Sequence, residues 1–166
     1  MAMKTIVVVS DTHRNKSALK KIANVIMEND YVFHLGDYYD DFVDYAYALK
    51  GKVFQVHGNC DYGTSEAETE ILTEIEGVKI FATHGHNYGV KQGREKLLRR
   101  AKELGATLVF YGHTHCPAYH VYEGEGVTVF NPGSIALPRQ MTPQGPTFLI
   151  IDLASDGRIT PELYTL

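Results

Sequence analysis

The hydrophobic positions of this 166-residue chain form short apolar runs that stop abruptly at polar residues. One such run, Tyr31 to Leu35, leads directly into Gly36 and Asp37. A short apolar run stopped by glycine is typical of an interior strand in an α/β sheet. Four other apolar runs are likewise followed within a few residues by Asp, Asn or His, and they cover residues 6–9, 53–56, 80–82 and 108–111. Ligands of open α/β sheets bind outside the carboxyl ends of the strands, so we expect the polar residues after these five strands to share one edge.

Helical periodicity separates the predicted strands. We expect helices over residues 16–28, 40–49 and 92–104. Asn15 can cap the first helix at its start, and Gly105 can close the last one. Leu19, Ile22 and Ile26 form an apolar stripe along the first helix. This helix and the strands on either side of it predict a right-handed βαβ unit.

The second half of the chain reads as antiparallel structure. A half-exposed strand over 66–75, the turn Glu76-Gly77 and a strand over 78–82 predict a hairpin. Further strands are expected over 118–122, 127–130, 148–153 and 158–164, with Pro161 confining the last to a sheet edge. Two sheets packed face to face, with helices outside, accommodate both halves. The expected fold is therefore α/β, in a single domain over residues 1–166.

Composition and net charge argue against some classes of function. Hydrophobic residues make up 44% of the chain and charged residues 22%, as in ordinary globular proteins. The net charge of −4 argues against an extended nucleic-acid surface. No run of 18 apolar residues occurs, so we expect no contact with a membrane and a cytoplasmic location. The chain has two cysteines, Cys60 and Cys116, for which a structural disulfide is an alternative to two free thiols.

The polar residues after the strands are of the types that bind metal ions. Asp11 and His13 flank one threonine, and His113 and His115 flank another. In an extended segment residues i and i+2 point the same way, so we expect each pair to reach one centre. Imidazole and carboxylate together suit Mn, Fe, Ni or Zn ions. The clustering at strand ends favours a metal-binding role for these histidines and for His84.

Other residues near these strand ends are given different roles. His34, His57 and His120 are expected to be ordinary core or surface histidines. His86 is expected to support the ligands or face the substrate, and Asp61 to orient a ligand through hydrogen bonds. Tyrosines in the surrounding loops could stack on a nucleobase or an aryl group; they are Tyr38, Tyr39, Tyr62 and Tyr88.

Five ordered motifs resemble those of the calcineurin-like metallophosphoesterases. They are Asp11-x-His13, Gly36-Asp37, Gly58-Asn59, His84-Gly85 and Gly112-His113-Thr114-His115. Asn131-Pro132-Gly133-Ser134 also resembles a loop of the small prokaryotic YfcE-type phosphodiesterase branch. The resemblance implies a four-layer α/β/β/α sandwich of two mixed β-sheets flanked by helices, and a possible homo-oligomer.

The resemblance also implies a ligand set and a reaction. One divalent ion would be held by Asp11, His13 and His115. A second would be held by Asn59, His84 and His113, with Asp37 bridging the two. Manganese is the first expectation, with Ni, Fe or Zn as alternatives. The implied activity is that of a phosphodiesterase, in which a hydroxide bridging the ions attacks phosphorus and no protein nucleophile is needed.

The motif Gly58-Asn59-Cys60-Asp61 departs from the family pattern, because many members carry histidine where this chain has Cys60. Asn59, Cys60 and Asp61 are the catalytic candidates here. A thiol can donate a proton but stabilises phosphate charge poorly. We therefore expect small phosphodiesters or activated aryl phosphates as substrates, because their leaving groups need little protonation.

Two other functions are compatible with parts of the sequence. The same fold serves as a non-catalytic protein-interaction scaffold in a subunit of the eukaryotic retromer complex, although the site of that subunit is degenerate and the ligand set here is complete. The second is a Cys-His hydrolase that would use Cys60 or Cys116 as nucleophile. Chelation would abolish the metal-dependent activity, whereas alkylation would abolish the thiol-dependent one.

Overall fold

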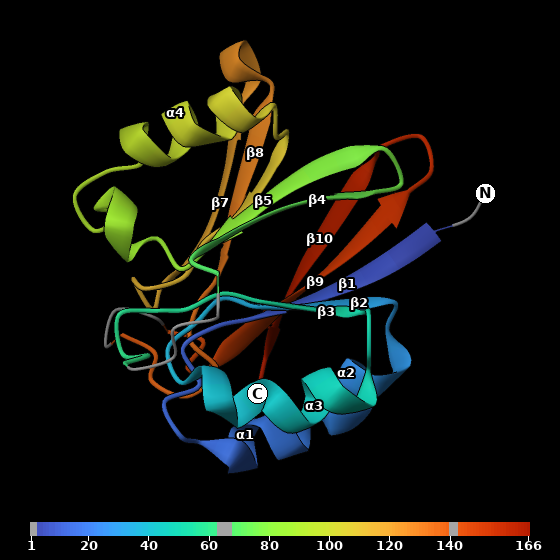
Figure 1. The fold of residues 1–166 in the computed structure, drawn as a ribbon, viewed down its shortest axis with the longest axis vertical. Helices are drawn as coiled ribbons and strands as arrows, with labels where there is room; N and C mark the ends of the chain where they lie inside the picture. Colours follow the sequence, from blue (N-terminus) through green and yellow to red (C-terminus); the bar gives the residue numbers. More distant parts are fainter. Residues whose placement is uncertain (1–2, 63–67, 140–142) are drawn as a thin grey trace.

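The computed structural model describes residues 3–62, 68–139 and 143–166. Two five-stranded sheets lie face to face. Helices α1, α2 and α3 cover the outer face of one sheet, and α4 covers the outer face of the other (Figure 1). The predicted α/β class and the arrangement of two mixed sheets flanked by helices are confirmed.

The first sheet has the strand order β10-β9-β1-β2-β3. Its adjacent strands β1, β2 and β3 run parallel, while β9 pairs antiparallel with both β1 and β10. The predicted βαβ unit forms its middle. The strands are β1 (Met3–Val9), β2 (Tyr31–His34), β3 (Val53–Gln55), β9 (Thr147–Ala154) and β10 (Ile159–Thr165).

The second sheet has the order β4-β5-β6-β8-β7. Strands β5, β6 and β8 are parallel, and antiparallel strands close both edges. The strands are β4 (Glu70–Ile75), β5 (Val78–Thr83), β6 (Leu108–Phe110), β7 (Pro117–Tyr122) and β8 (Val127–Pro132).

The alternation of side chains along the strands builds a separate core between each pair of layers. On β1, Ile6 and Val8 face the opposite sheet, while Val7 and Val9 face the helices. A third cluster packs Leu97 of α4 onto the second sheet. Successive strand residues point to opposite faces, so one apolar run serves two cores.

The first predicted helix is interrupted. It consists of α1 (Lys16–Lys21) and α2 (Ala23–Glu28), which meet at Ile22. The amide of Ile22 bonds to the carbonyl of Leu19, three residues back, and this tightens the turn. The predicted cap by Asn15 is confirmed, because its side chain accepts a hydrogen bond from the amide of Ala18 at 3.1 Å.

The other predicted helices begin differently from the sequence expectation. The segment expected at 40–49 starts as a 3₁₀ turn, η1 (Tyr39–Phe42), and continues as α3 (Val43–Ala48). Helix α4 (Glu95–Leu104) begins three residues late, and Gly105 closes it in a left-handed conformation as predicted. Two more 3₁₀ turns are η2 (His86–Tyr88) and η3 (Glu123–Glu125).

The antiparallel elements follow the sequence pattern with shifted bounds. Strand β4 begins at Glu70, and residues 66–67 of the predicted strand lie outside the described residues. Glu76 and Gly77 both have positive φ, as a two-residue hairpin turn requires. Pro161 lies on β10, an edge strand, as predicted.

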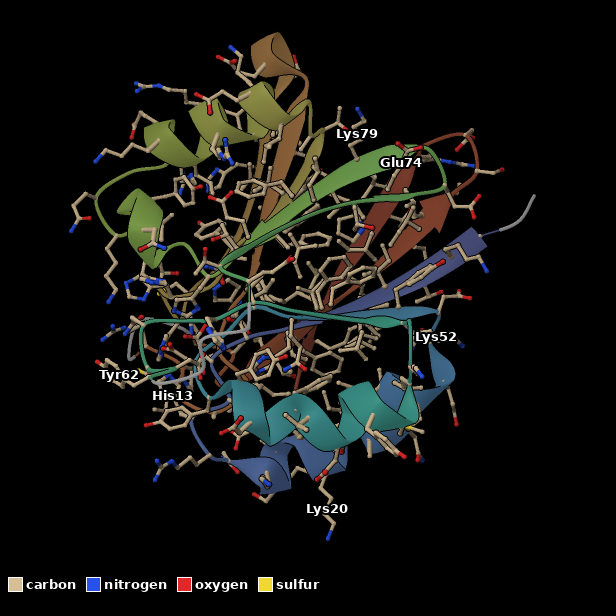
Figure 2. All side chains as sticks on the ribbon, viewed as in Figure 1. His13, Lys20, Lys52, Tyr62, Glu74 and Lys79 are labelled. Carbon is tan, nitrogen blue, oxygen red and sulfur yellow. The ribbon has the colours of Figure 1, made fainter. Side chains whose placement is uncertain are left out.

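Two further expectations are settled by the structure. Cys60 and Cys116 are both free, so the alternative of a disulfide between them is wrong. In the described part of the chain, no helix is both long enough and apolar enough to cross a membrane. The carboxyl ends of the parallel strands meet on one side, where Figure 2 labels His13 and Tyr62; Glu74 and Lys79 of the β4–β5 hairpin lie on the opposite side.

Candidate metal centre

Four predicted ligands from three loops meet after β1, β2 and β6. One potential ligand atom from each of Asp11, His13, Asp37 and His115 lies within 4.8 Å of the others. The Nε2 atom of His115 is 3.0 Å from Oδ1 of Asp11 and 3.2 Å from Nε2 of His13. We call these four residues the first donor group.

A second donor group lies beside the first. Nε2 of His84 is 3.1 Å from Oδ1 of Asn59 and 3.2 Å from Nδ1 of His113. The same nitrogen lies 3.4 Å from Oδ1 of Asp37. All seven predicted ligands are therefore gathered at one edge of the two sheets.

Asp37 belongs to both groups. Its Oδ1 atom faces His84 at 3.4 Å, while its Oδ2 atom faces His13 at 3.5 Å. Asp37 is almost completely buried, so its carboxylate is held away from bulk water. A carboxylate with one oxygen directed toward each donor group has the geometry of a bridge.

Backbone carbonyls fix the orientation of two imidazoles. Nδ1 of His84 lies 2.7 Å from the carbonyl oxygen of Leu35, and Nδ1 of His115 lies 2.6 Å from that of Leu137. A carbonyl oxygen accepts but never donates, so each Nδ1 carries the hydrogen. In the neutral rings the lone pair of Nε2 then points into the site, as a metal ligand requires.

The donor set fits metal ions. Oδ1 of Asp11 is buried and accepts no hydrogen bond of regular geometry from the residues that the structure describes, although its Oδ2 accepts one from Ser10 Oγ at 2.5 Å. Lone pairs of imidazole, amide and carboxylate converge on this oxygen and its neighbours. A cation stabilises such a concentration of acceptor atoms, and nitrogen with oxygen ligands suits borderline divalent ions.

The acidities in the site reflect burial and crowding. Burial opposes ionisation of Asp11, but the imidazoles of His115 and His13 outweigh it and hold the pKa of that carboxyl well below its usual range. Burial, followed by the nearby His84, lowers the pKa of His113 to about 4. Burial also disfavours protonation of His115, yet Asp11 raises its pKa overall. Near neutral pH the carboxylate of Asp11 is ionised and His113 is neutral, which are the forms that bind metals.

The ligand turns are not extended, which corrects one sequence expectation. Asp11, His13, His113 and His115 all have positive φ, between 44° and 67°. The pair from the last motif therefore does not reach one centre: His115 joins the first donor group, and His113 joins the second. The left-handed conformations cost of order 1 kcal/mol or more per residue, and other contacts must compensate for them.

Close approach of two glycines sets the spacing of the loops after β2 and β3. A Cβ atom on Gly36 would lie 2.5 Å from the amide nitrogen of Gly58, and one on Gly58 would lie 2.1 Å from Oδ1 of Asp37. The backbone of the Asn59 loop can therefore donate to the Asp37 carboxylate, through the amide of Cys60 at 2.9 Å.

Several residues that were not predicted to belong to the site support the ligand turns. Asp41 accepts hydrogen bonds from Thr12 Oγ1 at 2.8 Å and from the amide of Arg14 at 2.7 Å. Ser134 donates to the carbonyl of Asp11 at 2.9 Å. Asn131 donates to the carbonyl of Gly112. Only the motif around Asn131 and Ser134 offered a signal in the sequence, because the other contacts depend on loop conformation.

The remaining predicted site residues border the donor groups. His86 lies beside His84, with ring centroids 5.4 Å apart, and its Nδ1 is buried without a partner among the described residues. Burial and His84 lower its pKa. The ring of Tyr38 lies 5.3 Å from that of His13. Tyr62 is 89% exposed on the wall of an adjacent pocket.

Cys60 is unsuited to nucleophilic attack. Burial, followed by the charge of Asp37, raises the pKa of its thiol to about 11. A thiol of that acidity is protonated near neutral pH, whereas a catalytic cysteine reacts as the thiolate. This argues against the Cys-His hydrolase for Cys60.

The three histidines expected to lie outside the site have other surroundings. His34 is fully buried, stacks on Phe42 and contacts Thr12 Oγ1 at 3.3 Å. His57 is buried against the ring of Tyr39. His120 lies on β7, with its ring 6.1 Å from that of Tyr122.

Comparison of the sequence with protein families gives a match over most of the chain. The calcineurin-like phosphoesterase superfamily domain matches residues 3–156. A probable metallophosphoesterase of Bacillus subtilis, YsnB, is 32% identical over 153 residues, which span 92% of this chain and 86% of YsnB. Phosphodiesterase YfcE of Escherichia coli is 34% identical over 115 residues, which span 63% of this chain and 55% of YfcE.

Two solved structures have folds similar to that of this chain. A predicted phosphoesterase from Streptococcus pneumoniae superposes with a TM-score of 0.77 at 26% identity, covering 100% of this chain and 99% of that one. Vps29 from Entamoeba histolytica, solved in complex with zinc, superposes with a TM-score of 0.73 at 20% identity, covering 97% and 98% of the two chains. At that identity the second likeness shows the fold alone.

Proposed function

Because the chain belongs to the calcineurin-like phosphoesterase superfamily, we propose that it is a phosphodiesterase dependent on two divalent metal ions. The observation that carries this proposal is the carboxylate of Asp37, which directs one oxygen toward His84 and the other toward His13. In the proposed arrangement the first donor group holds one ion, the second donor group holds the other, and Asp37 is shared. Manganese is the ion we expect first.

When bound, two such ions would activate a water molecule as the nucleophile and neutralise the charge of the phosphoryl oxygens. The protein's own residues prepare the site. Leu35 and Leu137 hold the lone pairs of His84 and His115 inward. Asn59 is a neutral ligand and adds no negative charge. Asp61 holds the loop of Asp37 in place through backbone amides.

The proposed preference for diesters and aryl phosphates follows from Cys60. Its thiol, whose pKa is raised to about 11 by burial and by Asp37, is a weak proton donor to a leaving group. Departure of a good leaving group such as an aryl oxide requires little protonation, so this defect matters least for activated esters. A single domain, a cytoplasmic location and a homo-oligomeric state are parts of the same proposal.

The alternative is a non-catalytic scaffold of the same fold. The intact donor set favours catalysis. All seven ligands are present, and each has a donor atom within 3.5 Å of a donor atom from another loop. A scaffold has no need for buried carboxylates and left-handed ligand turns, which cost folding free energy.

The test is hydrolysis of bis(p-nitrophenyl) phosphate by the metal-free protein after Mn²⁺ is added, followed by chelation. We expect activity that appears with Mn²⁺, disappears with EDTA and is lost in Asp37→Asn. Asp152→Asn, on β9 away from the site, is the matched control and should hydrolyse the ester like the wild type. Metal binding without any hydrolysis would favour the scaffold, and activity that survives EDTA would contradict the metal-dependent proposal.

A further inference from the structure

We propose that Arg14 is a specificity-determining residue that binds a second phosphate of the substrate, so that the preferred diesters are nucleotide derivatives carrying a further phosphoryl group. This inference rests on the proposed phosphodiesterase function and names its substrate class. Arg14 directly follows the ligand His13, yet nothing in the donor groups requires an arginine there.

A pocket of about 250 Å³ lies next to the two donor groups. Three loops form its walls, and each contributes residues that directly follow a predicted ligand: Arg14 after His13, Tyr38 after Asp37, and Cys60 after Asn59. A substrate whose scissile phosphate lay between the donor groups would place an adjoining part of itself here. Asp40, Asp41, Asp61 and Tyr62 also line this pocket.

Arg14 is held in a defined position at the rim of this pocket. Its guanidinium carbon lies 5.0 Å from the centroid of the Tyr38 ring, in a cation–π contact. The ring of His13 also lies beside that of Tyr38, with centroids 5.3 Å apart. The backbone of Arg14 is fixed as well, because its amide donates to Asp41 at 2.7 Å. The guanidinium is therefore preorganised close to the first donor group.

Both side chains occupy costly backbone conformations. Arg14 has φ = 62° and Tyr38 has φ = 68°, in the left-handed region that favours glycine. Two large side chains at such positions are retained at a cost of about 1 kcal/mol or more each. Their shared direction toward one pocket offers a functional reason for that cost.

The positive charge of Arg14 is available to a ligand. Among the described residues no carboxylate forms an ion pair with its guanidinium. Asp41 is occupied by Thr12 and by the amide of Arg14, and Asp61 is occupied by backbone amides. The carboxylate of Asp40 is exposed and solvated. A guanidinium stacked on a ring keeps its N–H edge free, and that edge matches two oxygens of a phosphate.

The other walls favour an aromatic group. Tyr62 presents a ring that is 89% exposed. Bases stack on exposed aromatic rings with little sequence preference. An arginine with a free N–H edge and an exposed tyrosine in one pocket beside a phosphoesterase site are the groups that a nucleotide with a second phosphate would use.

The experiment compares two esters that differ only in that phosphate. They are thymidine 5′-(p-nitrophenyl phosphate) and its 3′-phosphorylated form. In both, water adds to the 5′ phosphorus and the bond to p-nitrophenolate breaks; the products are p-nitrophenolate and thymidine 5′-phosphate or thymidine 3′,5′-bisphosphate. With Mn²⁺ present, we expect kcat/KM of the wild type to be about tenfold higher for the 3′-phosphorylated ester, mainly through KM, as one exposed charge-assisted contact would give.

Substitutions test whether Arg14 causes this tenfold difference in kcat/KM between the two esters. In Arg14→Gln the tenfold ratio should fall to about one, while Arg14→Lys should keep part of it because the charge remains. Tyr38→Leu should also lower the ratio, and Tyr38→Phe should keep it. Arg139→Gln removes an equal charge near His115 but outside the pocket, and its ratio should stay near ten.

A binding measurement separates this inference from the proposed function. Isothermal titration of thymidine 5′-phosphate and thymidine 3′,5′-bisphosphate should show tighter binding of the bisphosphate to the wild type, and equal affinities for Arg14→Gln. That result would support the inference even if neither ester were hydrolysed, in which case the proposed function alone would fail. The role of Arg14 would be overturned if the wild type showed equal kcat/KM for the two esters and equal affinities for the two nucleotides. It would also be overturned if the tenfold ratio of kcat/KM survived in Arg14→Gln.

Discussion

Asp61 accepts a hydrogen bond from the backbone amide of Asp37, the residue whose carboxylate lies between the two donor groups, at 3.0 Å. The same oxygen of Asp61 accepts from Gly58 at 2.8 Å, and its other oxygen accepts from Tyr39 at 2.7 Å. One carboxylate therefore joins the loops after β2 and β3. Asp61 is a positioning residue in this account, and it touches no reacting atom.

Replacing Asp61 by asparagine should weaken metal binding. The side-chain NH₂ of asparagine cannot accept, so at least one of the three backbone amides loses its partner, at a cost of about 1–3 kcal/mol. Residues that orient metal ligands typically affect metal affinity by about 10- to 100-fold. We expect Asp61→Asn to show a fall of that size in Mn²⁺ affinity by calorimetry. Asp156→Asn, at an exposed turn, is the control, and equal affinities for both variants would contradict the positioning role.

Gly36→Ala should destabilise the protein far more than Gly51→Ala. Both glycines have positive φ, near 93° and 83°, so alanine strains the backbone at each, by about 1 kcal/mol. Only at Gly36 does the added Cβ meet backbone, 2.5 Å from the nitrogen of Gly58, whereas Gly51 has open space. Denaturant unfolding of the two variants should differ by at least about 2 kcal/mol. Similar losses would show that the loops after β2 and β3 do not pack as described.

His34 should make stability fall as the pH drops below about 6.5. Burial lowers the pKa of His34 to about 4 in the folded chain, against 6.5 for a free histidine. Between these values the unfolded chain binds the proton more tightly, so the free energy of unfolding rises with pH in this window and the contribution of His34 is lost toward pH 4. The loss amounts to about 3 kcal/mol.

The check is urea unfolding of the metal-free protein at several pH values. His34→Gln should give a shallower dependence of unfolding free energy on pH between about 4 and 6.5 than the wild type. His120→Gln, at the less buried histidine on β7, should change that slope less. Superimposable slopes for the wild type and His34→Gln would mean that His34 does not titrate as its burial implies.

Cys60→His should improve hydrolysis of alkyl esters more than that of aryl esters. An imidazole with a pKa near 6.5 donates a proton far more readily at neutral pH than a thiol whose pKa burial and Asp37 raise to about 11. A positioned general acid contributes about 10²- to 10⁴-fold, and poor leaving groups gain most. Rates for one alkyl and one aryl ester are measured with wild type, Cys60→His and Cys60→Ser. An equal gain on both esters would rule out the leaving-group explanation.

Much of the fold could be predicted because its signals are local. The apolar run from Ile6 to Val9 supplies two cores at once, and Gly36 and Gly112 directly follow two of the other apolar runs where the chain must turn. The turn at Glu76-Gly77 and the edge position of Pro161 likewise depend on the conformational preferences of single residues. The interruption at Ile22 could not be seen, because the stripe of Leu19, Ile22 and Ile26 stays buried across it.

Some features of the candidate site are visible in the local sequence, and others depend on contacts between residues far apart in the chain. Ligand identities could be predicted, because the residue types after each strand are visible in the sequence. The division of His113 and His115 between two donor groups was implied by the family resemblance but not by their spacing, because it depends on left-handed turns that replace the expected extended segment. The contacts of Ser134 with Asp11 and of Asp41 with Thr12 join residues far apart in the chain, and spacing gives no sign of them.

In the proposed function, Asp37 is shared by two metal ions. The most direct test is anomalous diffraction at the manganese edge from crystals grown with Mn²⁺. We expect two anomalous peaks per chain, one among Asp11, His13 and His115 and one among Asn59, His84 and His113, with a different oxygen of Asp37 on each. A single peak, or two peaks of which either lies away from Asp37, would contradict the account.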